Sequence, residues 1–296
     1  MLINHLAIIG VGLIGGSLAR SLRKAKQVGK VTGFGRDTGN LERAVELGVI
    51  DEFSLTLSRA VQDADVVVLA TPLSTTAKLL SGMCDYISDT AIITDVGSAK
   101  GSVVQDARQV LGDKFSRFVP GHPIAGREKS GVEAATEDLF KAHRVILTPC
   151  PETSVNAIAT ITKMWEYTGA EIAQLGVEQH DEILAATSHL PHMLAYALVD
   201  CLSSMQGRED IFRFAAGGFS DFTRIASSHP QMWTDICFSN REKLQVALDT
   251  FDEYLNKIRS AIENENSEEL LKIFTRAKQT RDRFTELRNQ RNNNPE

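Results

Sequence analysis

Cysteine is scarce in this chain, and the four cysteines lie far apart. Cys84, Cys150, Cys201 and Cys237 include no Cys-x-x-Cys pair. Scattered thiols of this kind indicate neither a disulfide framework nor a zinc site. A reducing compartment is compatible with this usage, and we therefore expect a cytoplasmic protein.

Long apolar runs and an excess of positive charge are also missing. No stretch approaches the ~20 apolar residues that a bilayer-spanning helix needs, and the chain enters a strand pattern at once, without the features of an export signal. The 296 residues carry a formal net charge of −6 at pH 7. Nucleic acids and anionic membranes require a basic surface, so we exclude both as main partners and expect a small-molecule substrate.

Short apolar runs alternate with helical patterns through the first part of the chain. The predicted strands cover residues 6–9, 31–34, 66–70, 92–95, 118–120 and 145–148, with a last one at 171–174. Such alternation is typical of an α/β fold, in which helices cover both faces of a doubly wound, mostly parallel sheet. We therefore predict a Rossmann-type domain over residues 1–175.

After residue 175 the strand patterns end and helical patterns take over. Apolar residues recur there at alternating steps of four and three, at Leu244, Leu248, Phe251, Leu255, Ile258 and Ile262. Such a heptad seam needs a partner helix, which lies either inside its own domain or across a subunit interface. We favour the interface, and predict an all-α dimerisation domain over residues 176–296 that forms a homodimer.

Three glycines follow the first predicted strand, in the order Gly10-Val11-Gly12-Leu13-Ile14-Gly15. The first permits a tight turn, the second lets the backbone approach a phosphate, and the third lets the next helix pack close to the strand. That helix offers the N–H groups of its first turn and its positive dipole end to an anion. Rather than a merely tight turn, we predict a nicotinamide dinucleotide site that includes Gly10, Gly12, Leu13, Ile14 and Gly15.

The second predicted strand ends at Gly35-Arg36-Asp37, where an acidic residue usually binds the ribose hydroxyls of NAD. Gly35 stands where that acid is expected. A glycine followed by arginine leaves room and positive charge for the 2′-phosphate of NADP. Alternatively, Arg36 is an ordinary exposed residue and Asp37 takes the ribose. We favour NADP over NAD, with Gly35 and Arg36 in the cofactor site.

Three more segments follow strands at the carboxyl edge of the sheet, where ligands bind in such folds. They contain Thr71 and Pro72, which we assign to the cofactor, then Ser98, and then His122, held between a glycine and a proline. A neutral imidazole at a strand end can accept a proton near pH 7, so His122 is a candidate general base. Taken alone, such a histidine is more often a surface residue or a backbone cap, and Ser98 can equally cap the helix that begins near Lys100.

The helical half supplies His180-Asp181, then Ser188-His189-Leu190-Pro191-His192, and Arg224 after a Gly-Gly break. Close histidines suggest a metal site, but Pro191 disturbs their spacing and the usual i, i+4 pair is missing, so we expect no metal. If a helix begins at Pro191, His192 lies in its first turn, where the helix dipole keeps the imidazole neutral. Arg224 is suited to bind a carboxylate, or else to pair with Asp221.

Together, these segments resemble the prephenate and arogenate dehydrogenase family of tyrosine biosynthesis. The resemblance runs nearly end to end and rests on five motifs: Gly10-x-Gly12-x-x-Gly15-Gly16-Ser17, Asp95-x-Gly97-Ser98-x-Lys100, Gly121-His122-Pro123-Ile124-Ala125-Gly126 with Glu128-Lys129-Ser130-Gly131, Ser188-His189-Leu190-Pro191-His192, and Gly217-Gly218-Phe219 with Phe222-Thr223-Arg224-Ile225-Ala226. The glycine triad is shared by many oxidoreductases, whereas the last four motifs together are specific. The resemblance implies a Rossmann domain followed by a helical dimerisation domain, in agreement with the heptad seam.

The resemblance also implies a reaction, the oxidative decarboxylation of prephenate, arogenate or both, with hydride transfer to NAD or NADP. His122 would be the catalytic base that accepts the proton of the ring hydroxyl group. Ser98 would hydrogen-bond His122 or that hydroxyl group and help to place the nicotinamide. Loss of carbon dioxide would then make the ring aromatic and the step irreversible.

Four further residues would bind or admit the substrate in this scheme. Arg224 would pair with a carboxylate, His192 and less directly His189 would meet the side-chain end of the substrate, and Glu128 would gate the entrance. We expect His122 and Arg224 to face each other across a gap the size of a six-membered ring. Arg127, beside the entrance, would favour prephenate as the more anionic substrate.

Two other functions are compatible with the residues. A β-hydroxyacid dehydrogenase also joins a Rossmann domain to a helical one and relies on a catalytic lysine, for which Lys100 is the candidate. A non-enzymatic nucleotide-sensing protein would bind the cofactor but would leave His122, His192 and Arg224 without a task.

Overall fold

The computed structural model describes residues 1–127, 129–205 and 208–293. The chain divides into two compact units, Met1–Leu244 and Gln245–Glu296. Within the described ranges, none of the helices combines the length and the apolar character required to cross a membrane. The predicted domain boundary after residue 175 stays a prediction.

Six parallel strands form the main sheet of the first unit, in the order β3-β2-β1-β4-β5-β6. Their bounds are β1 Ile3–Ile9, β2 Val28–Phe34, β3 Glu52–Ser54, β4 Val66–Leu69, β5 Ile92–Asp95 and β6 Phe118–Val119. The order reverses at β1 and β4, and ligands bind at such a switch point in doubly wound folds. The predicted Rossmann-type sheet is confirmed, with β3 as a strand that the sequence pattern did not predict.

The two faces of this sheet each bury their own apolar cluster. Ile8 belongs to one cluster, whereas its neighbours Ala7 and Ile9 belong to the other. The same alternation holds in β4, where Val68 faces one side and Val67 the other. Side chains of a strand point to opposite faces in turn, so continuous apolar runs indicate a sheet covered on both sides.

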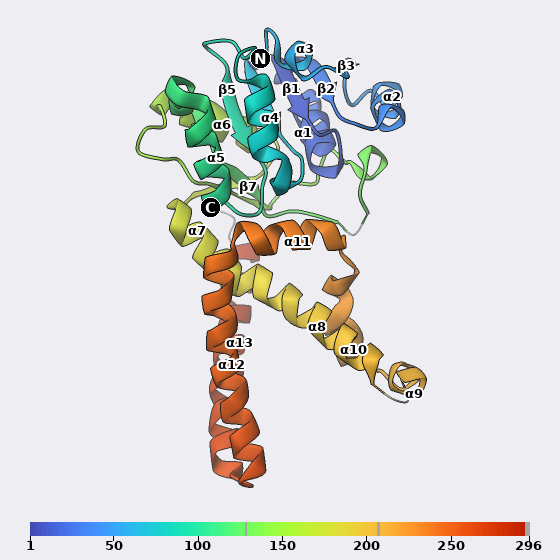
Figure 1. Ribbon diagram of the computed structural model, residues 1–296, viewed down its shortest axis with the longest axis vertical. Coiled ribbons are helices and arrows are strands. Elements are labelled where there is room, and N and C mark those ends of the chain that lie inside the picture. The colour runs from blue at the N-terminus through green and yellow to red at the C-terminus, as the bar shows by residue number, and fades with distance from the viewer. Residues whose placement is uncertain (128, 206–207, 294–296) are drawn as a thin grey trace. The chain divides into compact units, whose positions relative to one another are not determined.

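Six α-helices belong to this part of the fold, and Figure 1 shows α1, α4 and α5 packed around the strands. Their bounds are α1 Leu13–Lys24, α2 Thr38–Glu46, α3 Leu57–Val61, α4 Thr76–Met83, α5 Gly101–Leu111 and α6 Val155–Glu166. Short 3₁₀ segments connect them at η1 Leu73–Thr75, η2 Gly112–Arg117 and η3 Val132–Ala134. In α1, Leu18 and Leu22 are fully buried against the sheet, as its amphipathic spacing requires.

The last two predicted strands do not extend the main sheet. They form a second sheet in the order β7-β8-β9, with β7 Gly121–Pro123, β8 Arg144–Leu147 and β9 Glu171–Gln174. β7 pairs with β8 in antiparallel fashion, and β8 pairs with β9 in parallel. Pro120 separates β6 from β7 because proline cannot donate a ladder hydrogen bond. Its carbonyl oxygen accepts one from the Thr148 N–H group at 2.9 Å, which joins the two sheets.

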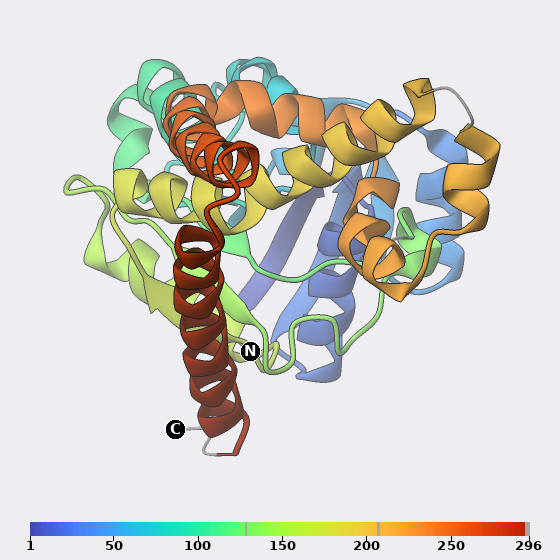
Figure 2. The ribbon, with the colours of Figure 1, turned by 90° about the horizontal axis from the view of Figure 1, so that it is seen from below.

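From residue 175 to the end of the first unit, the described residues form helices and connecting turns. These are α7 Val177–Leu184, the π-helical segment η4 Ala185–His189, α8 Leu190–Ser204, α9 Arg208–Arg213, α10 Gly217–Thr223, the 3₁₀ segment η5 Arg224–Ser227 and α11 Pro230–Ser239. In Figure 2, α7 and α8 (yellow) cross in front of the strands. The Ser74 hydroxyl group donates to Asp235 of α11 at 2.7 Å, and so fastens α11 to the turn after β4.

The second unit consists of most of α12 Arg241–Glu263 and of α13 Ser267–Asn293. The predicted heptad seam lies on α12. Its first residue, Leu244, is buried, whereas Leu255 is 42% and Ile262 is 61% exposed. In the isolated chain the seam is therefore only partly covered.

Candidate active site

The glycine turn after β1 has the geometry of a closely packed strand-turn-helix unit. Gly10 has a φ of +105°, and a Cβ atom there would lie 2.3 Å from the carbonyl oxygen of Ala70. A Cβ atom on Gly15 would lie 2.4 Å from the carbonyl oxygen of Gly10 and 2.7 Å from Ile8. Both positions therefore exclude any larger residue.

Gly12 differs from these two glycines because it faces open space. A Cβ atom there would meet no described atom within 4 Å. Gly12 is also the N-cap of α1, where no side chain caps the helix and no acidic residue occupies the first turn. The N–H groups at this helix end, including those of Leu13 and Ile14, thus lack a side-chain acceptor, and the residues fit the pyrophosphate of a dinucleotide.

The residues that follow β2 are those expected to bind the ribose of the cofactor. Arg36 is exposed, and the Asp37 carboxylate accepts a hydrogen bond from the Asn40 N–H group at 3.1 Å as the N-cap of α2. The Asn40 side chain in turn donates to the Val11 carbonyl oxygen at 2.7 Å, so α2 is tied to the glycine turn. Asp37 therefore has a structural task that competes with binding a ribose.

Thr71 and Pro72 follow β4 and border the same turn. The Thr71 methyl group would lie 2.9 Å from a Cβ atom on Gly10. The Thr71 hydroxyl oxygen accepts a hydrogen bond from the Thr75 hydroxyl group at 3.0 Å. These residues thus stand at the switch point of the sheet, beside the glycine turn.

Ser98 lies half-buried in the loop between β5 and α5. The alternative that Ser98 caps α5 is wrong, because α5 begins at Gly101 and the cap comes from a distant carboxylate. Asp181 accepts hydrogen bonds from the N–H groups of Lys100 at 2.8 Å and Gly101 at 2.7 Å. Asp181, about 80 positions further along the chain, therefore caps α5. Ser98 is available for another role.

Lys100 is fully buried and holds the backbone that carries His122. Its ammonium group pairs with the Asp95 carboxylate and donates to the Gly121 carbonyl oxygen at 2.7 Å. Asp95 also accepts from the Gly121 N–H group at 3.2 Å. Burial lowers the pKa of Lys100, and the Asp95 carboxylate opposes that shift. The pair thus clamps the first residue of β7 from both sides.

His122 is 8% exposed and lies in β7, next to His180 of α7. Its Nδ1 atom is 2.9 Å from Nε2 of His180, and Nδ1 of His180 is 2.7 Å from Oδ1 of Asp181. Burial, followed by the nearby His180, Lys100 and His189, lowers the pKa of His122 well below its usual 6.5. The imidazole is therefore neutral at pH 7, as a proton acceptor must be.

His189 lies beyond His180 and is 1% exposed. The Asn240 side-chain amide donates to the Asp181 carbonyl oxygen at 2.8 Å and to Nδ1 of His189 at 3.2 Å. Nε2 of His189 is buried, and a hydrogen bond between the His189 ring and the Ser98 backbone opposes the lowering of its pKa. Burial lowers the pKa of His189 to about 4, so this histidine is neutral. Because Nδ1 accepts from the Asn240 amide, the single ring proton is on Nε2.

His192 lies in the first turn of α8, next to Pro191, but α8 continues directly from the π-helical segment η4, so its start is not a free helix end. Its Nδ1 atom donates to the Ser188 carbonyl oxygen at 2.8 Å. Burial, and then Arg224, lower the pKa of His192, which agrees with the neutral imidazole expected. The ring stacks on Trp233 with 3.6 Å between centroids.

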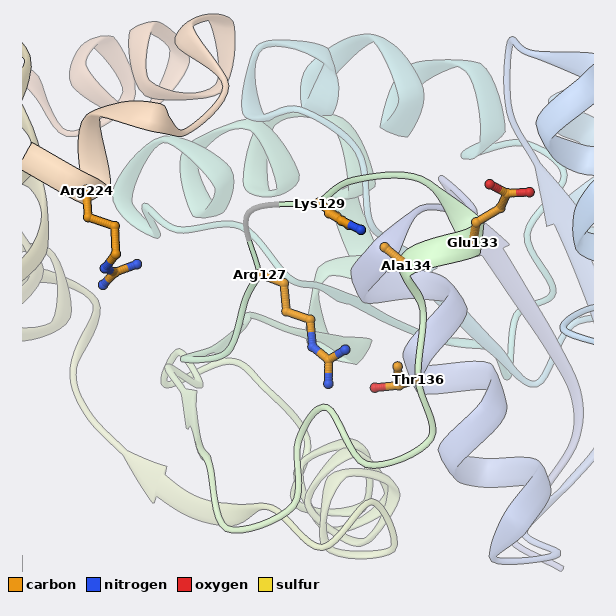
Figure 3. A pocket seen from close by; sticks show the side chains of 6 residues that line it. All are labelled: Arg127, Lys129, Glu133, Ala134, Thr136 and Arg224. Atoms are coloured by element: carbon orange, nitrogen blue, oxygen red, sulfur yellow. The ribbon is translucent and has the colours of Figure 1, made fainter. Parts of the chain in front are cut away.

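Arg224 lines a cavity of about 520 Å³ together with Arg127, Lys129, Glu133, Ala134 and Thr136. Figure 3 shows Arg224 on one side of this cavity and Arg127 between it and Thr136. His122 is not among the described residues that line it, so the facing pair of His122 and Arg224 stays a prediction. Glu128, the predicted gate, lies outside the described residues.

Sequence reasoning did not find how the residues around His122 are arranged. It names His180-Asp181 among the candidate groups of the helical half, but nothing in their spacing places them against a strand 58 residues earlier. Asn240 had no signal at all, because a single buried amide looks like any polar helix residue. In the described part of the chain, no cluster of three or more histidine, cysteine or acidic residues is arranged to hold a metal ion.

Comparison with known proteins adds family and fold relatives over nearly the whole chain. The family model described as prephenate dehydrogenase, nucleotide-binding domain, matches residues 18–174, and the one described as prephenate dehydrogenase, dimerization domain, matches residues 176–276. A prephenate dehydrogenase of Bacillus subtilis is 39% identical in an alignment 284 residues long, which covers 94% of this chain and 76% of the relative. A cyclohexadienyl dehydrogenase of Zymomonas mobilis is 37% identical over 94% of this chain and 95% of its own length.

A solved structure shares the fold as well. The crystal structure of prephenate dehydrogenase from A. aeolicus, in complex with hydroxyphenyl propionate and NAD⁺, superposes with a TM-score of 0.89 at 38% identity. The match covers 95% of this chain and 98% of that one.

Proposed function

The chain belongs to the prephenate dehydrogenase family, and on that premise we propose that it oxidises and decarboxylates prephenate, with NADP preferred over NAD, in tyrosine biosynthesis. The observation that carries the proposal is His122, a buried and neutral imidazole in β7, on a strand that Asp95 and Lys100 hold against the connection from β5 to α5. Membership of the family confirms the resemblance read from the motifs.

His122 is the catalytic base of this proposal. When bound, the nicotinamide ring supplies the oxidant that takes a hydride from the ring carbon bearing the hydroxyl group. His122 accepts the proton of that hydroxyl group, the bond to the ring carboxylate breaks, and carbon dioxide leaves as the ring becomes aromatic. Burial favours the neutral imidazole that this proton transfer needs. Ser98, in the loop beside it, would hydrogen-bond the base or the hydroxyl group.

Cofactor binding falls to Gly10, Gly12, Leu13, Ile14 and Gly15 for the pyrophosphate. Thr71, Pro72 and Ser98 would lie against the nicotinamide half. We assign the 2′-phosphate of NADP to Arg36, since Gly35 has no side chain and Asp37 already caps α2.

Substrate binding falls to Arg224, His192 and His189. Arg224 would hold a carboxylate, and the cavity that it lines with Arg127 and Lys129 is rich in positive charge. That charge favours prephenate, whose side chain carries a keto group, over arogenate, whose amino group is cationic. Glu128 remains our candidate for the gate.

The β-hydroxyacid dehydrogenase alternative depends on Lys100 as a catalytic lysine. Lys100 is fully buried, and its ammonium group is engaged by Asp95 and Gly121. A lysine held in this way is suited to support β7 rather than to meet a substrate. We therefore favour the prephenate dehydrogenase proposal, with the chain acting as a homodimer through its helical part, residues 176–296.

An assay of both substrates with both cofactors tests the proposal. We expect reduction of the nicotinamide to be fastest with prephenate and NADP, and Arg224→Ala to raise the substrate KM strongly while the cofactor KM changes little. Absence of turnover in all four combinations would refute the function.

Two variants test the cofactor assignment. Arg36→Ala should lower the ratio of kcat/KM for NADP over NAD by about 10-fold or more, because charge-assisted hydrogen bonds contribute roughly 1.5–3 kcal/mol. Gly35→Asp should shift preference towards NAD, and a Cβ atom there fits, with its nearest contact at 3.5 Å to Leu41. Arg59→Ala, which removes another exposed arginine, is the matched control. An unchanged ratio in Arg36→Ala would show that the phosphate is read elsewhere.

A further inference from the structure

We propose that Asp181 and His180 are positioning residues that hold the proton of neutral His122 on Nδ1, and so leave Nε2 as the atom that accepts the substrate proton. The inference rests on the proposed role of His122 as the base. It follows from the order of donors and acceptors along three side chains, Asp181, His180 and His122.

The chain of hydrogen bonds begins at the Asp181 carboxylate, which can only accept when ionised. Burial alone would raise its pKa, but the hydrogen bond from His180 and those from the Lys100 and Gly101 N–H groups outweigh burial and lower it. Both oxygens are thus occupied as acceptors, Oδ1 by Lys100 and His180, and Oδ2 by Gly101. Asp181 is therefore ionised at neutral pH, and it can only accept the hydrogen bond from His180.

The acceptor role of Asp181 then decides which nitrogen donates and which accepts in both imidazoles. Because Asp181 accepts, Nδ1 of His180 must donate, and the proposal places only this one N–H group on His180. Nε2 of His180 is therefore an acceptor, and it lies 2.9 Å from Nδ1 of His122. Nδ1 of His122 must donate in turn, and the free lone pair of His122 is on Nε2.

The charged groups around His122 make this assignment consistent. Lys100 from the β5–α5 loop disfavours a positive imidazole, and so would His180 from α7 and His189 from η4 if they were charged, while Asp95 neutralises Lys100. A neutral His180 that accepts from Nδ1 of His122 has the opposite effect. Asp181 is the carboxylate connected to His122 through hydrogen bonds, by way of His180. A proton taken up at Nε2 is thus stabilised along the chain, because the bonded Nδ1 proton points towards an acceptor connected to a carboxylate.

The positioning pair is itself held rigidly. Asp181 caps α5, so the chain of bonds is anchored to the loop that contains Ser98. Asn240 binds the Asp181 carbonyl oxygen from the other side and also fixes His189. One cluster of hydrogen bonds therefore sets the ring orientations of His180 and His189 together.

Nitrogen NMR of the chain labelled with ¹⁵N-histidine tests the proton position without any turnover. The ring signals of His122, assigned by their loss in His122→Asn, should report a neutral ring protonated on Nδ1. A ring protonated on Nε2 in the wild type would overturn the inference. His143→Gln, at an exposed histidine, controls for the loss of an unrelated ring.

The pH profile of kcat/KM tests the consequence for the base. His180→Phe should lower kcat/KM by roughly 100-fold or more, the range expected when general-base catalysis is impaired, and should move the acid limb to lower pH. His180→Gln, whose amide can accept from His122 and donate to Asp181, should restore most of the activity and the wild-type limb.

A purely structural role makes a different prediction. His180→Phe and His180→Gln would then lower the active fraction without moving the acid limb, and that result would overturn the inference. Failure of the proposed function is recognised separately, since the wild type would then turn over neither substrate while the NMR signals still report the proton position.

Discussion

At the scale of single residues, this site consists of histidines that are kept neutral by burial. His122, His189 and His192 all have a pKa below the usual value, and burial is the largest cause for each. Neutral rings can accept or donate one hydrogen bond at each nitrogen, so their neighbours decide which atom does which. Asn240 binds Nδ1 of His189, Asp181 binds Nδ1 of His180, and the Ser188 carbonyl oxygen binds Nδ1 of His192.

Burial of neutral histidines makes the stability of the fold depend on pH. An unfolded histidine binds a proton below pH 6.5, whereas His189 stays neutral in the fold down to pH about 4. Acid therefore favours the unfolded chain, and stability falls as the pH drops through this window. We predict that His189 alone removes about 1 kcal/mol of unfolding free energy between pH 7.5 and pH 5.5.

Urea unfolding of the wild type and of His189→Gln at the two pH values measures this contribution. The variant should lose less stability on acidification than the wild type, whatever its stability at pH 7.5. The exposed surface variant His143→Gln is measured alongside as a control for a lost histidine. Equal losses in the wild type and in His189→Gln would contradict the prediction.

Single residues could be predicted from the sequence where a local motif carries the signal. His192 after Pro191 lies in the first turn of a helix, whereas His122 lies inside the short strand β7 of the second sheet rather than directly after a strand of the main sheet. Asp181 could not be assigned its role, because it acts on backbone N–H groups 80 and 81 positions away. A side chain that caps a distant helix leaves no periodicity or spacing in the sequence.

At the scale of elements, the connection from β5 to α5 organises the site. Asp95 ends β5, Lys100 precedes α5, and together they bind the backbone of Gly121 at the start of β7. This buried ion pair holds the strand that carries His122. Breaking such a pair by removing one partner leaves an uncompensated buried charge.

We predict that Lys100→Met lowers the unfolding free energy by about 3–5 kcal/mol. The Asp95 carboxylate would lose its countercharge and Gly121 a hydrogen bond. Adding Asp95→Asn should recover part of the loss, since the remaining side chain is then neutral. Lys163→Met, at an exposed lysine of α6, should change stability little. A loss below 1 kcal/mol in Lys100→Met would contradict this account.

Most strands could be predicted from their apolar runs, but their grouping into sheets could not. The run at residues 145–148 looks like a further strand of the main sheet, yet it pairs with β7 in a second sheet. The reason is Pro120, which ends β6 after two residues and redirects the chain. β3 was missed because Glu52–Ser54 has three residues and a polar sequence.

At the scale of the whole molecule, the heptad seam of α12 indicates a partner. Leu255 and Ile262 are exposed in the single chain, and the matched family model for residues 176–276 is described as a dimerization domain. Exposed apolar side chains at heptad spacing are typical of a helix that pairs with another copy. The seam could be predicted from the sequence, but its partner could not.

We predict a homodimer with twice the 32.5 kDa mass of the chain, measured by sedimentation equilibrium. Leu255→Glu with Ile262→Glu should weaken dimerisation, because both place charge in the seam. Val246→Glu removes another exposed apolar residue of α12, 64% exposed and off the seam, and should leave the dimer intact. A wild-type monomer at micromolar concentration would contradict the prediction.

The central claim is that His122 takes the substrate proton during hydride transfer. A single-turnover measurement of nicotinamide reduction by His122→Asn tests it most directly, with cofactor affinity measured separately by titration. The account predicts that the rate of reduction falls by about 10²–10⁴-fold while the cofactor Kd changes little. A rate of reduction close to that of the wild type would contradict it.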